Sequence, residues 1–297
     1  MRPQLANAVT SVQNPRMRET RALTDDWRFA RTEIESNRPD HDDSDWEKVR
    51  IPHDWAISGP FAEENDMQND RIDEDGQLAE QRHSGRTGGL PHVGQAWYRR
   101  AFEVSRSRPV RLEFDGVMSH STVYVNGTKV GSWPYGYSSF AFDITDAVVA
   151  GTNTLAVHVD NPPRASRWYP GAGIYRDVRL VELDPVHIDH WGVAITTLIS
   201  DARARVTVST SIVGQGQADV VTRILDPSGN EVAASSTAGR GPAAVETVVD
   251  VPSPLLWSVD SPALYTAVVS VAADGSTDET STRFGIRTID FSPEVEA

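Results

Sequence analysis

Short segments in which apolar and polar residues alternate, with turn residues between them, constrain the fold of this chain more than any other feature. Successive side chains of a strand point to opposite faces of a sheet, so this pattern predicts sheets with one buried face. No long segment has a convincing apolar period of 3.6 residues. The pattern therefore predicts an all-β sandwich, whose first clear strands are residues 97–104, 110–115, 122–131, 140–145 and 153–160.

The segment 122–131 is read as two strands joined by a tight turn, because it contains Asn126-Gly127. This dipeptide tolerates positive φ at both central positions of a two-residue hairpin loop. The segment therefore predicts a β-hairpin centred on these two residues.

A change of composition near Leu183-Asp-Pro185 predicts a second domain. About seven short strands in about 105 residues then suit an immunoglobulin-like β-sandwich. The chain has no Cys, so the Cys…Trp…Cys pattern of antibody domains is absent. We expect a polar lead-in over 1–20, one sandwich over 21–183 and the immunoglobulin-like sandwich over 184–289.

An acidic insertion over residues 59–95 interrupts the first domain. Eight carboxylates and one arginine, Arg71, lie between Phe61 and Glu80. Asp70, Asp73 and Asp75 resemble the spacing of hard calcium ligands, but they do not match the twelve-residue calcium loop. A solvated, mobile loop without a metal is the favoured interpretation.

The charge and hydropathy of the chain exclude several classes of partner. The formal net charge is −14 and the sequence pI is near 5.0, which opposes nucleic-acid binding by phosphate neutralisation. No apolar stretch is long enough to span a membrane. The first 21 residues are polar and lack the apolar core of a signal peptide. We therefore predict a cytoplasmic protein that binds neither nucleic acid nor membrane.

The segment 167–181 contains the candidate ligand-binding residues. Arg167, Trp168 and Tyr169 stand on a Gly- and Pro-rich turn that leads directly into an alternating strand. Aromatic faces stack on the C–H patches of a sugar, and a guanidinium donates hydrogen bonds to hydroxyls. From residue chemistry alone, an equally good interpretation is that Trp168 and Tyr169 close one end of the sandwich.

Two other arrangements of histidines do not predict chemistry. His53 and Asp54 are adjacent, so on an extended chain their side chains point in opposite directions, and no serine nucleophile motif accompanies them. His187 and His190 are three positions apart on an expected strand and face opposite sides. We interpret His53-Asp54-Trp55 as a structural corner and expect no zinc site at the second pair.

Taken in order, these segments resemble the N-terminal half of the family 2 glycoside hydrolases, which include β-galactosidases, β-glucuronidases and β-mannosidases. Each matching piece is short, and the common order over about residues 21–291 is what makes the resemblance specific. The pieces begin at Asp26-Trp27, Ile51-Pro-His-Asp-Trp55, Gly94-Gln-Ala-Trp-Tyr98, Phe114-Asp-Gly116, Gly136-Tyr-Ser138, Asn153-Thr-Leu155, Arg167-Trp-Tyr169, Leu256-Trp-Ser258, Pro262-Ala-Leu-Tyr265 and Arg283-Phe-Gly-Ile-Arg287.

The resemblance implies a galactose-binding-like jelly roll followed by an immunoglobulin-like domain. In the family a (β/α)₈ barrel follows, and it carries both the acid/base Glu and the nucleophile Glu. The retaining mechanism needs two carboxyls about 5–5.5 Å apart, and no position here matches either motif. We therefore expect residues 290–297 to lead to an absent barrel, no catalytic residue, no metal and no cofactor in this chain, and no hydrolysis by the chain alone.

For binding, the resemblance implies that jelly-roll loops lean over the mouth of the barrel. The residues concerned would be Arg167, Trp168 and Tyr169, with His92 from a second loop. Large bacterial β-galactosidases have Asp-Met-Trp-Arg where this chain has Arg167-Trp-Tyr-Pro170, so their sodium-holding acid is missing here. The expected partners are a β-glycoside and a barrel, in cis or from an adjacent chain, and a homo-oligomer is possible. The alternatives are a free-standing carbohydrate-binding module and an assembly subunit of a split glycosidase.

Overall fold

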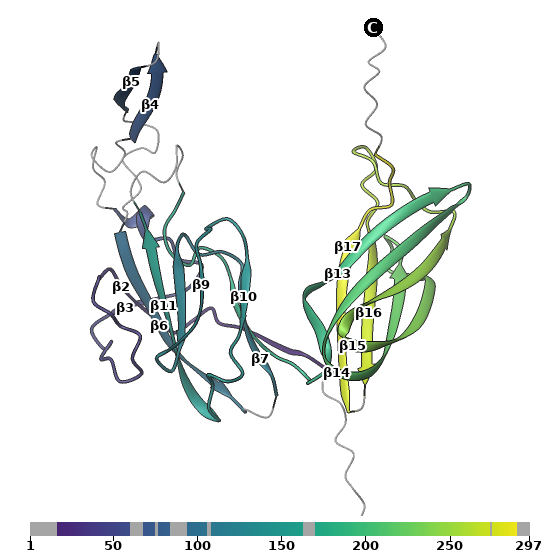
Figure 1. Cartoon of the computed structure of the whole chain (residues 1–297), viewed down its shortest axis with the longest axis horizontal. Helices are drawn as coiled ribbons and strands as arrows, with labels where there is room; N and C mark the ends of the chain where they lie inside the picture. The colour runs from purple at the N-terminus through teal and green to yellow at the C-terminus, as the bar shows by residue number, and fades with distance from the viewer. Residues whose placement is uncertain are drawn as a thin grey trace, which may run out of the picture. The chain divides into compact units, whose positions relative to one another are not determined.

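The computed structural model describes residues 17–59, 68–74, 77–83, 94–105, 108–162, 170–273 and 275–289. The chain divides into two compact units, which are described separately (Figure 1). One unit is Thr20–Glu182, and the other contains Leu183–Ala297 with Met1–Glu19. Apart from the short 3-10 helix η1 (Trp55–Ser58), the regular elements of the described residues are β-strands. The predicted all-β class is thus confirmed.

The first unit is a sandwich of two sheets that pack their apolar faces together. One sheet has the strand order β3 (Glu47–Val49), β2 (Trp27–Ala30), β6 (Gly94–Val104), β11 (Gly151–Asn161), β8 (Ser121–Val125) and β9 (Thr128–Trp133). The other has the order β1 (Glu19–Ala22), β12 (Val178–Glu182), β7 (Val110–Phe114) and β10 (Phe140–Asp143). Strands that are distant in sequence are neighbours in both sheets, as in the predicted jelly roll.

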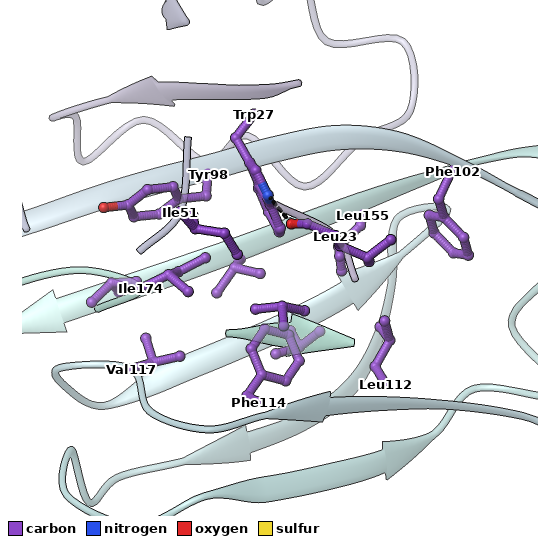
Figure 2. Close-up of a cluster of buried hydrophobic side chains, with 14 of the residues drawn as sticks. Leu23, Trp27, Ile51, Tyr98, Phe102, Leu112, Phe114, Val117, Leu155 and Ile174 are labelled. Carbon is purple, nitrogen blue, oxygen red and sulfur yellow. Dashed lines mark hydrogen bonds between the residues drawn. The ribbon is translucent and has the colours of Figure 1, made fainter. Parts of the chain in front are cut away.

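Alternation along the strands builds the core between these sheets. Trp27, Tyr98 and Leu155 come from the larger sheet and are fully buried, and they face Leu112 and Phe114 of β7 (Figure 2). The indole Nε1 of Trp27 donates a hydrogen bond of 2.6 Å to the Leu23 carbonyl, which pairs the polar atom of this ring inside the core. Burial of a polar atom without such a partner would cost free energy.

The predicted hairpin at Asn126-Gly127 is confirmed. It joins β8 to β9, and Val125 pairs with Thr128 across the turn. Asn126 and Gly127 have φ of 50° and 82°, which are the positive values that a two-residue hairpin loop requires.

The acidic insertion differs from the irregular loop that its charges predicted. Residues Gln68–Glu74 form β4 and pair in antiparallel register with Gln77–His83, β5. The two residues between the strands are Asp75 and Gly76. Asp-Gly is a favoured hairpin dipeptide. It was the sequence signal for this pair of strands, and the prediction from charge alone did not use it.

The second unit is an immunoglobulin-like sandwich in which two long strands take part in both layers. The strands are β13 (His187–Ser200), β14 (Arg203–Leu225), β15 (Glu231–Pro252), β16 (Tyr265–Ala273) and β17 (Ser276–Phe284). Residues 203–212 of β14 pair with β13 and with the end of β15, whereas residues 219–225 pair with β16 and with the start of β15.

Both long strands change layer at one irregularity in their pairing. The β14–β15 register shifts between Ile212 and Gly216. Gly214 has φ of 98°, and a Cβ there would lie 2.2 Å from the Pro185 carbonyl oxygen. Only glycine fits this position, so this single residue determines where the strands bend. Both layers contribute alternate apolar residues, such as Val206, Val208 and Ile224, to one shared core.

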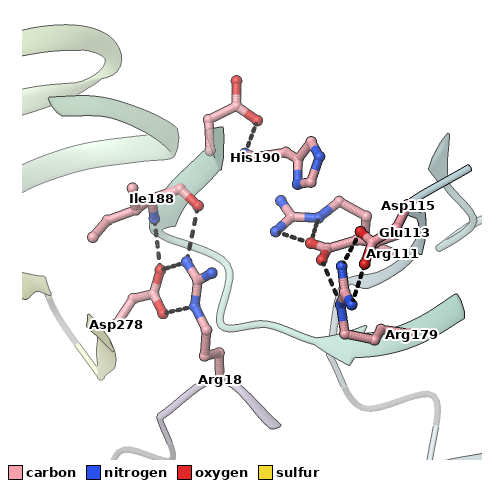
Figure 3. A network of polar contacts seen from close by, with 9 residues as sticks. Arg18, Arg111, Glu113, Asp115, Arg179, Ile188, His190 and Asp278 are labelled. Atoms are coloured by element: carbon pink, nitrogen blue, oxygen red, sulfur yellow. Dashed lines mark hydrogen bonds and ion pairs between the residues drawn. The ribbon is translucent and has the colours of Figure 1, made fainter. Parts of the chain in front are cut away.

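A buried ion pair stabilises one edge of this second unit. Arg18 donates to both carboxylate oxygens of Asp278 at 2.7 and 2.6 Å, and Asp278 also accepts from the Ile188 N–H at 2.7 Å (Figure 3). Asp278 is 2% exposed. Both oxygens of the buried carboxylate therefore have donors, as a buried charge requires.

Candidate functional site

The four residues predicted to bind a ligand lie outside the described residues. Arg167, Trp168 and Tyr169 fall within residues 163–169, and His92 falls within residues 84–93. The structure does describe the chain on both sides of the aromatic turn. We call these flanking residues, Asn161, Pro162 and 170–174, the turn stem. Its contacts determine how firmly the fold holds the two ends of the turn.

The corner His53-Asp54-Trp55 holds one side of the stem. The Asp54 carboxylate Oδ1 accepts hydrogen bonds from the Ala172 N–H at 2.8 Å and from the Ala56 N–H at 3.0 Å. The Trp55 N–H donates to the Ala172 carbonyl at 3.0 Å, and the His53 N–H donates to the Ile174 carbonyl at 2.7 Å. The backbone of the stem is therefore paired as firmly as a strand, although it is not part of a named strand.

Met118 holds the other side of the stem. Met118 and Gly173 exchange two backbone hydrogen bonds of 2.9 Å, which form an isolated antiparallel bridge. The stem is thus fixed between two separate parts of the jelly roll. Both described ends of the turn therefore start from backbone that the fold holds in place.

Two glycines make this close approach possible. Gly171 has φ of 74°, and a Cβ there would lie 3.0 Å from Asp54 Oδ2. Gly173 has φ of 113°, and its Cβ would lie 2.3 Å from the Tyr98 hydroxyl oxygen and 2.7 Å from the His53 carbonyl oxygen. Both the backbone conformation and the space exclude other residues here. The Pro-Gly-Ala-Gly sequence is therefore explained by the anchoring of the stem.

A partly buried polar contact joins His53, which holds the stem, to Tyr98 of β6. His53 Nδ1 is 2.7 Å from the Tyr98 hydroxyl oxygen, and the His53 ring packs edge-on against Phe29 with centroids 4.7 Å apart. Burial lowers the pKa of His53, although the nearby Glu47 and Asp54 carboxylates oppose this shift. Burial raises the pKa of Tyr98 well above its usual range. His53 is therefore neutral at pH 7 and serves packing and hydrogen bonding.

Asn161 joins the two ends of the stem. Its Nδ2 donates to the Gly171 carbonyl at 3.3 Å, and the residue is 1% exposed. Within the described part of the chain its Oδ1 is buried and has no hydrogen-bond partner. Asn161 ends β11, so the same strand that supports the core also closes the base of the turn.

From the sequence, the corner at His53-Asp54-Trp55 was interpreted as structural. The segment that it supports was not identified. The adjacency of His53 and Asp54 gave no sign that both contact a segment about 120 positions later, and Asn161 was not singled out. Asn161 directly precedes the Pro-Pro pair that opens the turn, and this was the available signal.

The described residues contain neither a cluster of metal-ligating side chains nor a membrane-spanning helix. Among these residues, no group of three His, Asp or Glu side chains is placed to hold a metal ion. In the same part of the chain, no helix is long and apolar enough to cross a bilayer.

A jelly roll with an anchored aromatic turn, followed by an immunoglobulin-like sandwich, is the architecture of the non-catalytic domains of a glycoside hydrolase. Residues 20–185 match the sugar binding domain of the glycosyl hydrolases family 2, and residues 186–287 match a second domain of glycosyl hydrolases family 2. The chain therefore belongs to glycosyl hydrolases family 2, as the sequence motifs predicted.

Individual relatives agree with this assignment. The chain is 36% identical to the β-galactosidase BoGH2A of Bacteroides ovatus over 295 residues, which cover 94% of this chain and 32% of the relative. It is 34% identical to a putative β-glucuronidase of Formosa agariphila, covering 86% of this chain and 24% of the relative. The structure of a family 2 member from Bacteroides cellulosilyticus matches with a TM-score of 0.79 at 31% identity, covering 92% of this chain and 36% of that one.

The chain thus spans about a third or less of the length of these relatives. It holds the N-terminal domains of the family. The described residues contain no (β/α)₈ barrel, since their regular elements are the strands and the single 3-10 helix given above.

Proposed function

We propose that this chain provides the sugar-binding part of an enzyme that hydrolyses β-glycosides. Arg167, Trp168 and Tyr169 contact the sugar, and His92 reaches it from the second loop. The observation that carries this proposal is the double anchoring of the turn stem by Asp54 and Met118. A turn that only closed the end of a sandwich would not need its base fixed from two sides and joined by a buried asparagine.

The chemistry of the turn suits a pyranose ring. The faces of Trp168 and Tyr169 offer stacking surface for sugar C–H groups, and each ring carries a polar group at its edge. The Arg167 guanidinium offers a planar fork of donors that matches either two hydroxyls or a carboxylate. Relatives named as β-galactosidase and β-glucuronidase make galactose and glucuronate the first sugars to test.

Hydrolysis itself belongs to residues outside these 297 positions. Retaining hydrolysis requires two rigid carboxyls about 5–5.5 Å apart, and our proposal places both on a barrel supplied in cis or by an adjacent chain. The chain alone is then inactive and contributes binding only. The cytoplasmic location remains a prediction.

The experiment uses the purified 297-residue chain. Isothermal titration calorimetry with galactose, glucuronate and mannose is expected to give millimolar binding of at least one sugar, and Trp168→Ala should abolish it. Aryl β-galactosides and β-glucuronides should not be hydrolysed. Turnover that stays with the chain through every purification step would contradict the proposal, as would sugar binding that Trp168→Ala leaves intact.

A role in assembly is the second candidate, and an exposed apolar group in the second unit favours it. Leu255, Leu256 and Val259 are 59%, 50% and 83% exposed. They flank Trp257, whose backbone N–H donates to the Ile286 carbonyl. They therefore lie beside the residues that directly follow β17. Exposed apolar groups favour association. Light scattering that shows a monomer at high concentration would count against this role.

A further inference from the structure

Two exposed tyrosines next to each other form a surface on the jelly roll that the function proposed above does not use. Tyr135 and Tyr137 lie on the loop between β9 and β10 and are 59% and 42% exposed. Their rings meet edge to face, with centroids 5.7 Å apart and planes at 61°. Large aromatic side chains are costly to leave in water, so a pair of them on a surface loop indicates a ligand.

This loop is held rigidly by its neighbours. The Pro134 carbonyl accepts from the His120 N–H at 3.2 Å, and the Gly136 carbonyl accepts from the Tyr175 hydroxyl at 2.7 Å. A Cβ on Gly136 would lie 2.4 Å from the Met118 sulfur, so the loop backbone sits directly on this side chain. The two tyrosines are therefore presented from a fixed backbone, and binding would order little that is not already ordered.

A third tyrosine and a cation complete the cluster. Tyr175 and Arg176 directly follow the turn stem, and the Arg176 guanidinium carbon lies 5.5 Å from the centre of the Tyr175 ring. Partial burial raises the pKa of Tyr175, Arg176 lowers it, and Tyr137 and Tyr135 raise it further. The Tyr175 hydroxyl donates to the carbonyl of Gly136, the residue between Tyr135 and Tyr137, at 2.7 Å, so this phenol group lies at the loop that carries the other two tyrosines. We call Tyr135, Tyr137, Tyr175 and Arg176 the tyrosine platform.

Met118 connects the tyrosine platform to the turn stem. Its backbone pairs with Gly173 of the stem, and its side chain lies under Gly136 of the platform loop. The two surfaces therefore share one supporting residue, which places the platform beside the base of the aromatic turn.

We propose that the tyrosine platform is a second sugar subsite, which binds a neutral pyranose of a glycan chain whose next residues lie at the aromatic turn. This inference rests on the proposed function for the first subsite. The rings of Tyr135 and Tyr137 stack on the C–H face of the sugar, and the exposed Arg176 donates to its hydroxyls.

A neutral sugar fits the charges better than an acidic one. Arg176 is followed by the exposed Asp177, whose side chain is 62% exposed, and the whole chain carries a formal net charge of −14. A uronate chain would be repelled at long range. An apolar peptide fits less well, because each tyrosine presents a hydroxyl that must keep a polar partner.

The test compares a single sugar with a chain of the same sugar on the full 297-residue protein. Wild type is titrated with galactose, with β-1,4-linked galactotetraose and with tetragalacturonate. Tyr137→Ala and Arg176→Ala probe the platform, and Trp168→Ala probes the turn. Trp191→Ala, which removes an exposed aromatic of the second unit, is the matched control. Urea unfolding midpoints establish that each variant is folded.

We expect wild type to bind galactotetraose more tightly than galactose. Tyr137→Ala and Arg176→Ala should each weaken tetraose binding about 3- to 10-fold, as expected for one stacking or charged contact, and weaken galactose binding less, because the aromatic turn still binds a single sugar. Trp191→Ala should change neither.

Each of the other outcomes contradicts a particular part of the two proposals. Equal tetraose affinity in wild type and Tyr137→Ala removes the platform as a subsite, even if Trp168→Ala abolishes binding and so supports the first subsite. Weakening by Tyr137→Ala alone, without any effect of Trp168→Ala, contradicts the function proposed for the turn. Tighter binding of tetragalacturonate than of galactotetraose contradicts a neutral ligand, and no binding of any of the three sugars overturns both subsites.

Discussion

The Asp54 carboxylate accepts a hydrogen bond of 2.8 Å from the backbone N–H of Ala172, a residue 118 positions later in the chain. The same oxygen accepts from the Ala56 N–H and so begins helix η1. One side chain thus fixes both the corner of the jelly roll and the base of the aromatic turn. Residues that do not touch the sugar should therefore control sugar binding through the position of the turn.

Replacement of Asp54 tests this control. Asp54→Ala leaves the N–H groups of Ala56 and Ala172 without their acceptor, and we expect it to lower the free energy of unfolding by about 2 kcal/mol or more. Asp54→Asn keeps one oxygen acceptor, so the loss should be about half as large. Urea unfolding followed by tryptophan fluorescence measures both, and calorimetry should show weaker sugar binding in the same order.

Asp143→Ala is the matched control for this measurement. Asp143 also accepts from a backbone N–H, that of Thr145 at 2.8 Å, but it is exposed and belongs to β10. Its loss should change stability slightly and sugar binding not at all. If both variants weakened sugar binding equally, the anchoring role of Asp54 would be wrong.

Gly173→Ala should destabilise the first unit for two separate reasons. The added methyl carbon would lie 2.3 Å from the Tyr98 hydroxyl oxygen and 2.7 Å from the His53 carbonyl, and φ is 113°. Gly151→Ala has a comparable φ of 89° but no close neighbour, so it isolates the backbone term of about 1 kcal/mol. We expect Gly173→Ala to cost at least twice as much in urea unfolding, and equal costs would contradict the packing argument.

The fold was predictable because its signals are local and repeated. Alternation along residues 97–104 and 153–160 indicates strands with one buried face, and these became β6 and β11. Asn126-Gly127 specifies a hairpin by its conformation alone. The start of β15 was missed, since residues 231–241 are rich in Ala, Ser, Thr and Gly and pair mainly because β14 lies beside them.

The candidate site was less predictable because its contacts connect distant segments. The segment 167–181 drew attention to this part of the jelly roll, yet nothing local links Asp54 to Ala172 or Met118 to Gly173. Nothing in the sequence marked Tyr135 and Tyr137 as binding residues, although Tyr137 belongs to one of the segments that resemble the family. Only the structure shows that Gly136, which lies between the two tyrosines, accepts a hydrogen bond from the Tyr175 hydroxyl. Long-range contacts of this kind follow from topology rather than from spacing.

The buried pair Arg18–Asp278 should contribute far more stability than an exposed ion pair. Removing the carboxylate leaves the buried Ile188 N–H without its acceptor and the Arg18 guanidinium without this counter-ion (Figure 3). Asp278→Ala should lower the free energy of unfolding by about 3–5 kcal/mol. The control Asp250→Ala breaks an exposed pair with Arg205 and should cost about 1 kcal/mol or less. Similar losses in the two variants, measured in urea, would contradict this expectation.

The stability of the first unit should fall as the pH drops below about 6.5, the pKa of histidine in an unfolded chain. Burial lowers the pKa of folded His53 and of folded His158. In the window between the folded and unfolded pKa values, the unfolded chain binds more protons, so the free energy of unfolding rises with pH. The full contribution is present above this window and is lost progressively as the pH falls through it.

Urea midpoints at pH 7.5 and 5.5 measure this loss directly. His53→Gln keeps a polar partner for Tyr98 but cannot be protonated, so its midpoint should fall less between the two pH values than that of wild type. His158→Gln should act in the same way, and the double variant should be least sensitive to pH. The carboxyl groups of Asp40, Asp42 and Asp226 do not contribute to the change in stability between these two pH values, because their pKa values are lowered and lie below the window. An unchanged pH dependence in the double variant would mean that neither histidine is kept neutral by the fold.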